Sequence, residues 1–324
     1  MVKIYGYEIG GMTGSNLEAA KWAERAARQG DVIGFEKLAY FYAQGLGVPK
    51  NMETARHYFG LALAKNELKA INGDPEAQVA LGNLYGGWAA DLGDDGDTMK
   101  WYLRAAAQDY AEAQHIIGRC NLHGFRGVTK DLDEAVSWLR QAAEQGHLEA
   151  ASELGQLYDD DSEGMLNIKE AMKWYFHAAS RGHVISQVSL GSLFMSMYTK
   201  SNIRRAKDTY LNSTLYWWRK AAEWGDGYVV SNLMMYPYLV EPRTGSDQPI
   251  GRAELQFQKE LFSLMKMLAD AGNEEAQIYL AIYYRDGYDQ IVSKDSQMAV
   301  FWLSKAADRG NREASRLMGE IEIE

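Results

Sequence analysis

The chain has 324 residues, of which 47% are hydrophobic and 24% charged, as in ordinary soluble folded proteins. Its net charge of −10 argues against nucleic-acid binding, which needs a basic surface, and its one cysteine, Cys120, excludes an intrachain disulfide. The sequence contains no secretory signal and no apolar run near the roughly 20 residues that span a bilayer, so we expect a cytoplasmic protein without a membrane span.

After an N-terminal extension of residues 1–16, we expect a single helical-repeat domain over residues 17–321. One large anchor residue recurs through this region at spacings of 36 to 47 residues. The anchors are Trp22, Tyr58, Trp101, Trp138, Trp174, Trp217, Leu264 and Trp302. A unit of 36 residues explains every spacing if inserts are allowed. We place these inserts near residues 64–73, 87–97, 196–209 and 237–251.

Each unit is predicted to contain two helices separated by a glycine. A small residue usually follows the anchor by four positions, and in most units a glycine follows by eight, where a left-handed residue ends the first helix. These glycines are Gly30, Gly146, Gly182, Gly225, Gly272 and Gly310. In the second unit the glycine comes seven residues later, at Gly73. Seven residues are about two turns, so that helix is expected to lengthen without rotating its apolar face.

The second helix of each unit is predicted to begin at a capping side chain. Candidate N-caps follow the glycines directly, at Asp31, Asp74, Asp226, Asn273 and Asn311. Inside the second helix, a leucine or a similar residue is often followed by a glycine, as at Gly82, Gly118, Gly155 and Gly191. A glycine inside a helix costs about 1 kcal/mol relative to alanine, so its recurrence needs a packing reason. We expect two helix backbones to cross there at close range.

The loop Gly45-Leu46-Gly47-Val48-Pro49-Lys50 has the glycines and the lysine of a phosphate-binding loop. Such a loop requires a preceding strand and a glycine directly before its lysine. Here Pro49 precedes Lys50, helical sequence lies on both sides, and the loop recurs near Gly127. We therefore interpret it as a turn between two repeats.

The combined pattern resembles the Sel-one-like repeat family, which is related to the tetratricopeptide repeats. The quoted pattern is A-x-x-W-x-x-x-A-A-x-x-G, followed by A-x-x-x-L-G-x-x-Y-x-x-G-x-G-V. It is matched best at residues 135–146 and 171–182 for the first half and at residues 77–85 and 150–158 for the second. The resemblance covers roughly residues 17–321. It implies an all-α fold, an α-solenoid superhelix of about eight helix-turn-helix repeats, that binds other proteins as an adaptor or scaffold.

No catalytic, cofactor-binding or metal-binding residue is assigned from the sequence. Cys120 occupies a position that is apolar in the other units, so we expect a buried thiol rather than a nucleophile. Ser263 and Lys266 form an S-x-x-K motif, but the partner motifs of β-lactam-binding enzymes are missing. The acidic stretches 91–97 and 159–164 lack the spacing of a calcium-binding loop. The six histidines form no metal-binding motif, which leaves a site assembled across repeats unsupported.

Partner-binding candidates come from residues that depart from the repeat. Trp224 stands where other units have glutamine or arginine, and Trp88 replaces a corner glycine. Either tryptophan could be covered by a neighbouring insert or be available to a partner. The proline-rich insert 237–251 adds Tyr238 and Arg243 as candidates, because loops on rigid scaffolds often make specific contacts.

These observations predict a non-enzymatic protein that binds a protein partner through its concave surface and its inserts. Two roles remain open, a regulatory adaptor and an inhibitor or immunity protein that neutralises a toxin. The acidic balance favours a basic partner. The alternative is an enzyme, of hydrolase or β-lactam-binding type, with a site assembled across repeats.

Overall fold

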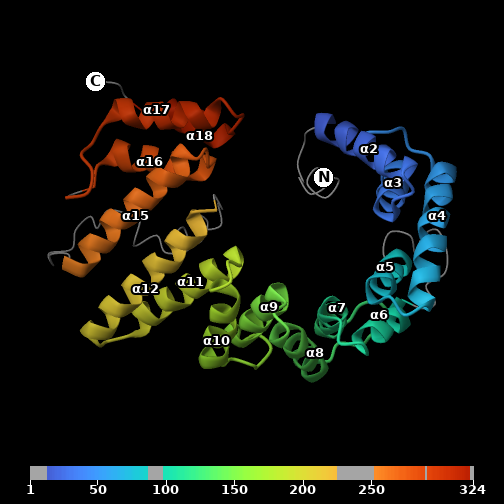
Figure 1. Ribbon diagram of the computed structural model, residues 1–324. Helices are drawn as coiled ribbons and strands as arrows, with labels where there is room; N and C mark the ends of the chain where they lie inside the picture. The colour runs from blue at the N-terminus through green and yellow to red at the C-terminus, as the bar shows by residue number, and fades with distance from the viewer. Residues whose placement is uncertain (1–12, 87–97, 225–251, 289, 322–324) are drawn as a thin grey trace. The chain divides into compact units, whose positions relative to one another are not determined.

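The computed structural model describes residues 13–86, 98–224, 252–288 and 290–321, and these residues form helices connected by short turns (Figure 1). The helices are α2 (Thr13–Arg28), α3 (Val32–Gln44), α4 (Met52–Ile71), α5 (Pro75–Gly86), α6 (Thr98–Ala106), α7 (Ala111–His123), α8 (Leu132–Glu144), α9 (Leu148–Asp159), α10 (Ile168–Ala179), α11 (Val184–Lys200), α12 (Arg204–Ala222), α15 (Arg252–Asp270), α16 (Glu274–Asp286), α17 (Ser296–Ala307) and α18 (Arg312–Met318). The prediction of an all-α repeat fold is confirmed. Among the described helices, none has both the length and the apolar character needed to cross a bilayer.

The chain divides into two compact units, Met1–Ala150 and Ala151–Glu324. The repeats that we expected to form a single domain over residues 17–321 are divided between these two units, and the boundary lies inside α9. Within each unit, helices that follow one another along the chain pack side by side, as α3 does with α4 and α11 with α12 (Figure 1). The largest apolar cluster of the second unit extends from Val188 to Leu317 and joins α11, α12, α15, α16, α17 and α18.

The turns between paired helices follow the predicted glycine and cap pattern. Positive φ angles between 73° and 96° occur at the predicted glycines that lie within the described residues, which are Gly30, Gly73, Gly146, Gly182, Gly272 and Gly310. The side chains of Asp31, Asp74, Asn273 and Asn311 each accept a backbone N–H of the following helix. Local chemistry thus sets the ends of these helices.

The loop at Gly45 and Gly47 is a turn between α3 and α4, as predicted. Gly45 ends α3 with a left-handed φ of 73°. Gly47 has a φ of 70°, and a Cβ atom built on it would lie 2.3 Å from the backbone oxygen of Asn16. Both the backbone conformation and the close approach require glycine at position 47.

Two of the four expected inserts lie in lengthened helices. The insert near 64–73 extends α4 to 20 residues, and the insert near 196–209 falls at the end of α11 and the start of α12, which have 17 and 19 residues. Lengthening a helix adds no unpaired backbone groups, because each added residue continues the hydrogen-bond ladder. The inserts at 87–97 and 237–251 lie outside the described residues.

The recurring glycine in the second helices has a different packing reason from the one we expected. At Gly155 and Gly191 it faces a large side chain and not a second backbone, whereas a Cβ atom on Gly118 would lie 2.8 Å from the Leu139 side chain and 3.2 Å from the Leu139 backbone nitrogen. A Cβ atom on Gly155 would lie 2.4 Å from the Tyr175 ring, and one on Gly191 would lie 2.4 Å from the Trp218 ring. The prediction of two backbones crossing at close range is wrong at these positions. The glycine makes room for the residue that directly follows each anchor.

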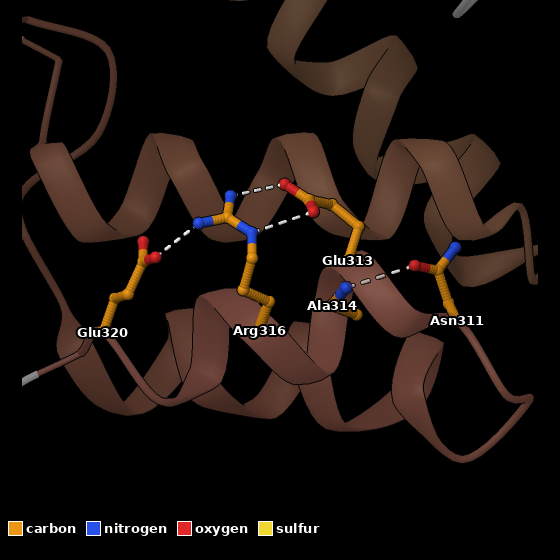
Figure 2. Close-up of polar contacts among 5 residues, drawn as sticks. All are labelled: Asn311, Glu313, Ala314, Arg316 and Glu320. Atoms are coloured by element: carbon orange, nitrogen blue, oxygen red, sulfur yellow. Dashed lines mark hydrogen bonds and ion pairs between the residues drawn. The ribbon is translucent and has the colours of Figure 1, made fainter.

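The helix α18 shows how the repeat keeps a polar outer surface (Figure 2). Its buried residues are Ala314 and Leu317. On the exposed side, the guanidinium of Arg316 donates to Glu313 through Nε at 3.0 Å and Nη2 at 2.6 Å, and Nη1 donates to Glu320. The Arg316 hydrogen bonds hold the pKa of the Glu313 carboxyl below its usual value. Asn311 caps the helix by accepting the Ala314 N–H at 3.1 Å.

Candidate protein-interaction surface

The anchor residues of the second unit are part of its core. Trp174, Trp217 and Trp302 are between 2% and 8% exposed, so their main role is structural. Trp218 is fully buried and donates its indole N–H to the Val188 carbonyl at 3.2 Å, which confirms that it is a core residue. Trp224 is different, because 71% of it is exposed. The other predicted partner-binding residues, Trp88, Tyr238 and Arg243, lie outside the described residues.

Exposed apolar side chains recur around the buried anchors of the second unit. They occupy the positions one residue before, two residues after or three residues after the anchor, on the first helix of each pair. Phe176 on α10 is 56% exposed, Tyr216 on α12 is 55%, Met267 on α15 is 40% and Phe301 on α17 is 46%. Exposed apolar side chains that repeat on neighbouring helices are typical of surfaces that bind a partner, so these positions form a candidate interaction surface.

Basic residues fill most of the remaining positions of the same register. We call the whole set the aromatic–lysine surface; it consists of Lys173, Phe176, Tyr216, Arg219, Lys220, Lys266, Met267, Phe301 and Lys305. No acidic residue occupies these three register positions in the second unit, although the chain as a whole carries more acids than bases. This surface is therefore basic, whereas the protein as a whole is acidic.

Ring contacts fix the aromatic side chains of this surface on the buried anchors. Phe176 packs edge-on against Trp217, with 5.7 Å between ring centroids, and thereby connects α10 with α12. Tyr216 and Phe301 pack in the same way on the anchors that follow them, at 5.0 Å and 5.1 Å. Such contacts limit side-chain motion, so the exposed rings lose little entropy when a partner binds.

Two lysines of this surface, Lys173 and Lys305, are placed over aromatic rings. Lys305 Nζ lies 4.5 Å from the ring centroid of Phe301 and 4.6 Å from that of Trp302. Lys173 Nζ lies 4.7 Å from the centroid of Trp174. Each cation–π contact contributes about 0.5–1 kcal/mol at an exposed site. These contacts keep the ammonium groups close to the apolar rings that a partner would cover.

Acidic residues pair with three of the basic side chains of this surface. Lys173 pairs with Glu170 at 3.3 Å, Lys220 pairs with Glu223 at 3.1 Å, and Arg219 pairs with Glu260 of α15. Exposed ion pairs contribute at most about 1 kcal/mol, so a partner carboxylate can replace these acids at small cost. Three of the five basic residues of the surface thus have an acidic neighbour that a partner carboxylate can displace.

This surface was not predicted from the sequence, although the register contained a signal for it. Phe176, Tyr216 and Phe301 do not depart from the repeat pattern, because they occupy variable positions that have no strong residue preference. The available signal was the absence of acids at three register positions on four first helices. Without the structure, these positions could not be distinguished from those that a neighbouring helix covers.

The motifs considered for catalysis lie on ordinary repeat helices and turns. Ser263 and Lys266 are both exposed on α15, and Leu264 between them is 5% exposed in the core. In the acidic stretch after α9, the Asp160 carboxylate accepts the backbone N–H of Ser162 at 2.8 Å, which lowers the Asp160 pKa. That contact is a local turn contact. The stretch 91–97 lies outside the described residues.

Cys120 is a core thiol, as predicted. It is fully buried in α7, and burial raises its thiol pKa, an effect that the charges of Arg126 and Arg119 partly oppose. We expect a disulfide reagent to label Cys120 on the order of 100-fold more slowly in the native protein than in urea, because access requires local opening that costs several kcal/mol. Absorbance at the leaving thiolate measures both rates. Equal rates in the two conditions would contradict the buried position.

A family model for the Sel1 repeat matches residues 4–31, 36–67, 75–110, 111–147, 148–183, 211–226 and 274–311. A Sel1 repeat protein from Oxalobacter formigenes superposes with a TM-score of 0.50 at 23% identity, over 98% of this chain and 85% of that chain.

Two fungal proteins also match in sequence. The chitin synthase regulator SKT5 of Saccharomyces cerevisiae is 29% identical over 44% of this chain, and the chitin synthase regulatory factor 3 of Schizosaccharomyces pombe is 32% identical over 42%. The matches cover only 21% and 14% of those two proteins. The seven matched repeats extend over well more than half of the sequence, and the chain belongs to the Sel1 repeat family.

Proposed function

We propose that this protein is a non-enzymatic scaffold that binds a protein partner through the aromatic–lysine surface of its second unit. Sel1 repeat proteins are protein-interaction scaffolds, and the repeat supplies the rigid framework here. The observation that carries the proposal is the row of exposed apolar side chains, Phe176, Tyr216, Met267 and Phe301, on four first helices of one unit. Trp224, which is exposed two residues after the end of α12, extends the same interaction.

The chemistry of the surface favours a partner segment with apolar side chains and carboxylates. Its rings provide the rigid aromatic contacts that dominate protein interfaces, Lys305 provides a cation beside them, and Lys266 adds a further exposed cation on α15. The expectation of a basic partner was based on the total charge of the chain and stays a prediction for the acidic loops. For the aromatic–lysine surface, the local charge favours an acidic segment.

Two roles remain within this function, a regulatory adaptor and an inhibitor of a toxic protein. Both need a surface of this kind, and stoichiometry distinguishes them. One partner bound in a 1:1 complex supports an inhibitor, whereas several partners on the same surface support an adaptor.

A zero-length cross-linking experiment tests the proposed surface. A carbodiimide joins a lysine amine only to a carboxylate in direct contact. We expect Lys266 or Lys305 to be joined to aspartate or glutamate of a partner when the full chain is mixed with an extract of its host. In the variant Phe176→Ser/Phe301→Ser, we expect the yield of this product to fall about tenfold or more, because two central apolar contacts are lost.

The matched control is Ile185→Ser. Ile185 is 43% exposed, but it lies on α11, a second helix, away from the aromatic–lysine surface. This control variant should give the same cross-linked product as the unmodified chain. Equal cross-linking by the Phe176→Ser/Phe301→Ser variant, with its circular dichroism unchanged, would contradict the proposed surface.

A further inference from the structure

A cluster of two histidines and one glutamate lies in the first unit, far along the sequence from the aromatic–lysine surface. Glu112 and His115 are one turn apart on α7, and His147 directly precedes α9. One ligand atom from each of the three side chains lies within 4.8 Å of those from the other two. The Nε2 atom of His147 is 3.0 Å from Oε2 of Glu112, and the rings of the two histidines have centroids 4.3 Å apart.

The geometry points to a binding site for one zinc ion, held by Glu112, His115 and His147, with water as a fourth ligand. Two imidazole nitrogens and one carboxylate oxygen form a donor set that suits zinc, which binds such atoms at about 2.0–2.2 Å in a tetrahedron. Tetrahedral ligands at those bond lengths are about 3.3 Å apart. The 3.0 Å between Nε2 of His147 and Oε2 of Glu112 is close to this value. The remaining ligand distances are within 4.8 Å, and rotation of the side chains can shorten them.

The burial of the three side chains suits a bound ion that keeps one water. His115 is buried, the His147 side chain is 13% exposed, and the Glu112 side chain is 50% exposed. The two histidines can therefore hold an ion in a partly dry position, while the side of Glu112 stays open for entry and for the water ligand. A site with an open fourth position needs this combination.

The charges around the cluster also favour a cation. The Glu149 carboxylate lies 3.5 Å from Nδ1 of His147, so a second carboxylate stands beside the cluster in addition to Glu112. The nearest basic residue along α7 is Arg119, one turn beyond His115, and its side chain is exposed. Acids thus outnumber bases close to the cluster.

Zinc binding requires a change of tautomer at His147. Nδ1 of this ring accepts the Ala150 N–H at 3.2 Å, so Nε2 carries the ring proton and donates it to Glu112. When zinc takes the lone pair of Nε2, the ring proton moves to Nδ1, where the Glu149 carboxylate can accept it. A carboxylate beyond the metal-bound histidine is the usual partner of such ligands. No proton is gained or lost overall in this step.

The repeat itself does not require this cluster. At the position of His115 the other second helices have residues such as Val79, Ser152 and Val188. At the position of His147, two other repeats use an asparagine cap, Asn273 and Asn311. Stacking of the helices therefore does not explain why two histidines meet beside a glutamate here.

Titration of zinc into the metal-stripped full chain tests the site by calorimetry and by melting temperature. We expect one equivalent to bind with micromolar or tighter affinity and to raise the melting temperature, because the ion binds the native state. His115→Val and His147→Asn each introduce a residue that other repeats use, so both variants should fold. We expect each to weaken zinc binding at least about 100-fold, more than the loss of an outer-shell partner causes.

The control is His183→Asn, which changes the equivalent cap of α11 and should leave zinc binding unchanged. Cobalt provides a second measurement, since its visible absorption is intense when the ion has four ligands. Absence of zinc binding by the unmodified chain would overturn the assignment. So would full binding by His115→Val, or equal loss of binding in His183→Asn, which would show adventitious surface binding.

Discussion

Replacing Trp218 by alanine is expected to lower the free energy of unfolding by about 3–5 kcal/mol, the largest effect of any substitution proposed for this protein. Trp218 is fully buried, belongs to the main apolar cluster of the second unit and donates a hydrogen bond to Val188. Its removal leaves a cavity beside Gly191, whose missing side chain provides the space for the indole. Urea denaturation followed by circular dichroism measures the loss.

The contact between Trp218 and Gly191 predicts that Gly191→Ala destabilises the unmodified protein but stabilises the Trp218→Ala variant. In the unmodified chain, Gly191→Ala places a Cβ atom 2.4 Å from Trp218, and such overpacking costs about 1–3 kcal/mol. In the Trp218→Ala background this obstacle is gone, and the substitution should stabilise the protein by about 1 kcal/mol, the helix preference of alanine over glycine.

Gly60 provides the matched control for this experiment. It lies within α4 on the exposed side, and an added Cβ atom would meet nothing within 4 Å. Gly60→Ala should therefore stabilise the protein by about 1 kcal/mol in both backgrounds. If Gly191→Ala had the same effect with and without Trp218, the packing reason for the recurring glycine would be refuted.

The parts of the fold that depend on local chemistry could be predicted from the sequence. The positive φ at Gly146 follows from its neighbours in the sequence, because glycine adopts that conformation at little cost. The cap at Asn273 is equally local, because the side chain accepts the backbone N–H of Ala276 in the helix that it begins. The lengthening of α4 followed from the seven residues that delay Gly73. Each of these features depends only on the sequence of one turn and of the helix next to it.

Features that depend on packing between helices were not predictable in the same way. The reason for Gly155 depends on the direction of the Tyr175 ring, which comes from the next pair of helices. The meeting of His115 and His147 likewise joins two repeats, so no local motif reveals it. The boundary between the two units lies inside α9 and has no mark in the composition.

The candidate site could likewise be predicted only in part, because exposure depends on packing between helices. The sequence identified Trp224 because glutamine or arginine usually stands at its position, and the structure shows that this side chain is exposed. The rings of Phe176 and Phe301 were not identified, because an apolar residue at a variable position is buried in one repeat and exposed in another. Only the arrangement of neighbouring helices decides between these outcomes.

Trp224→Gln is expected to weaken partner binding by about 2 kcal/mol or more, roughly 30-fold, while the melting temperature stays the same. The side chain is 71% exposed, so its removal leaves no cavity in the described core, and glutamine already stands at this register in repeats that contain Gln29 and Gln145. An exposed indole loses little entropy on binding and buries a large apolar area, which makes it a strong contact.

The control is Arg181→Gln, which makes the same replacement at the same register of the preceding repeat. Arg181 donates to the His177 carbonyl at 2.9 Å and is exposed, so its loss should change neither stability nor affinity much. Melting temperature and affinity for the partner identified by cross-linking are measured on the same samples. If Trp224→Gln folded fully and bound the partner as tightly as the unmodified chain, Trp224 would not be part of the interface. A lower melting temperature with unchanged affinity would assign the indole to packing within the second unit, and the binding energy would then have to come from the rings around Trp217 and Trp302 alone.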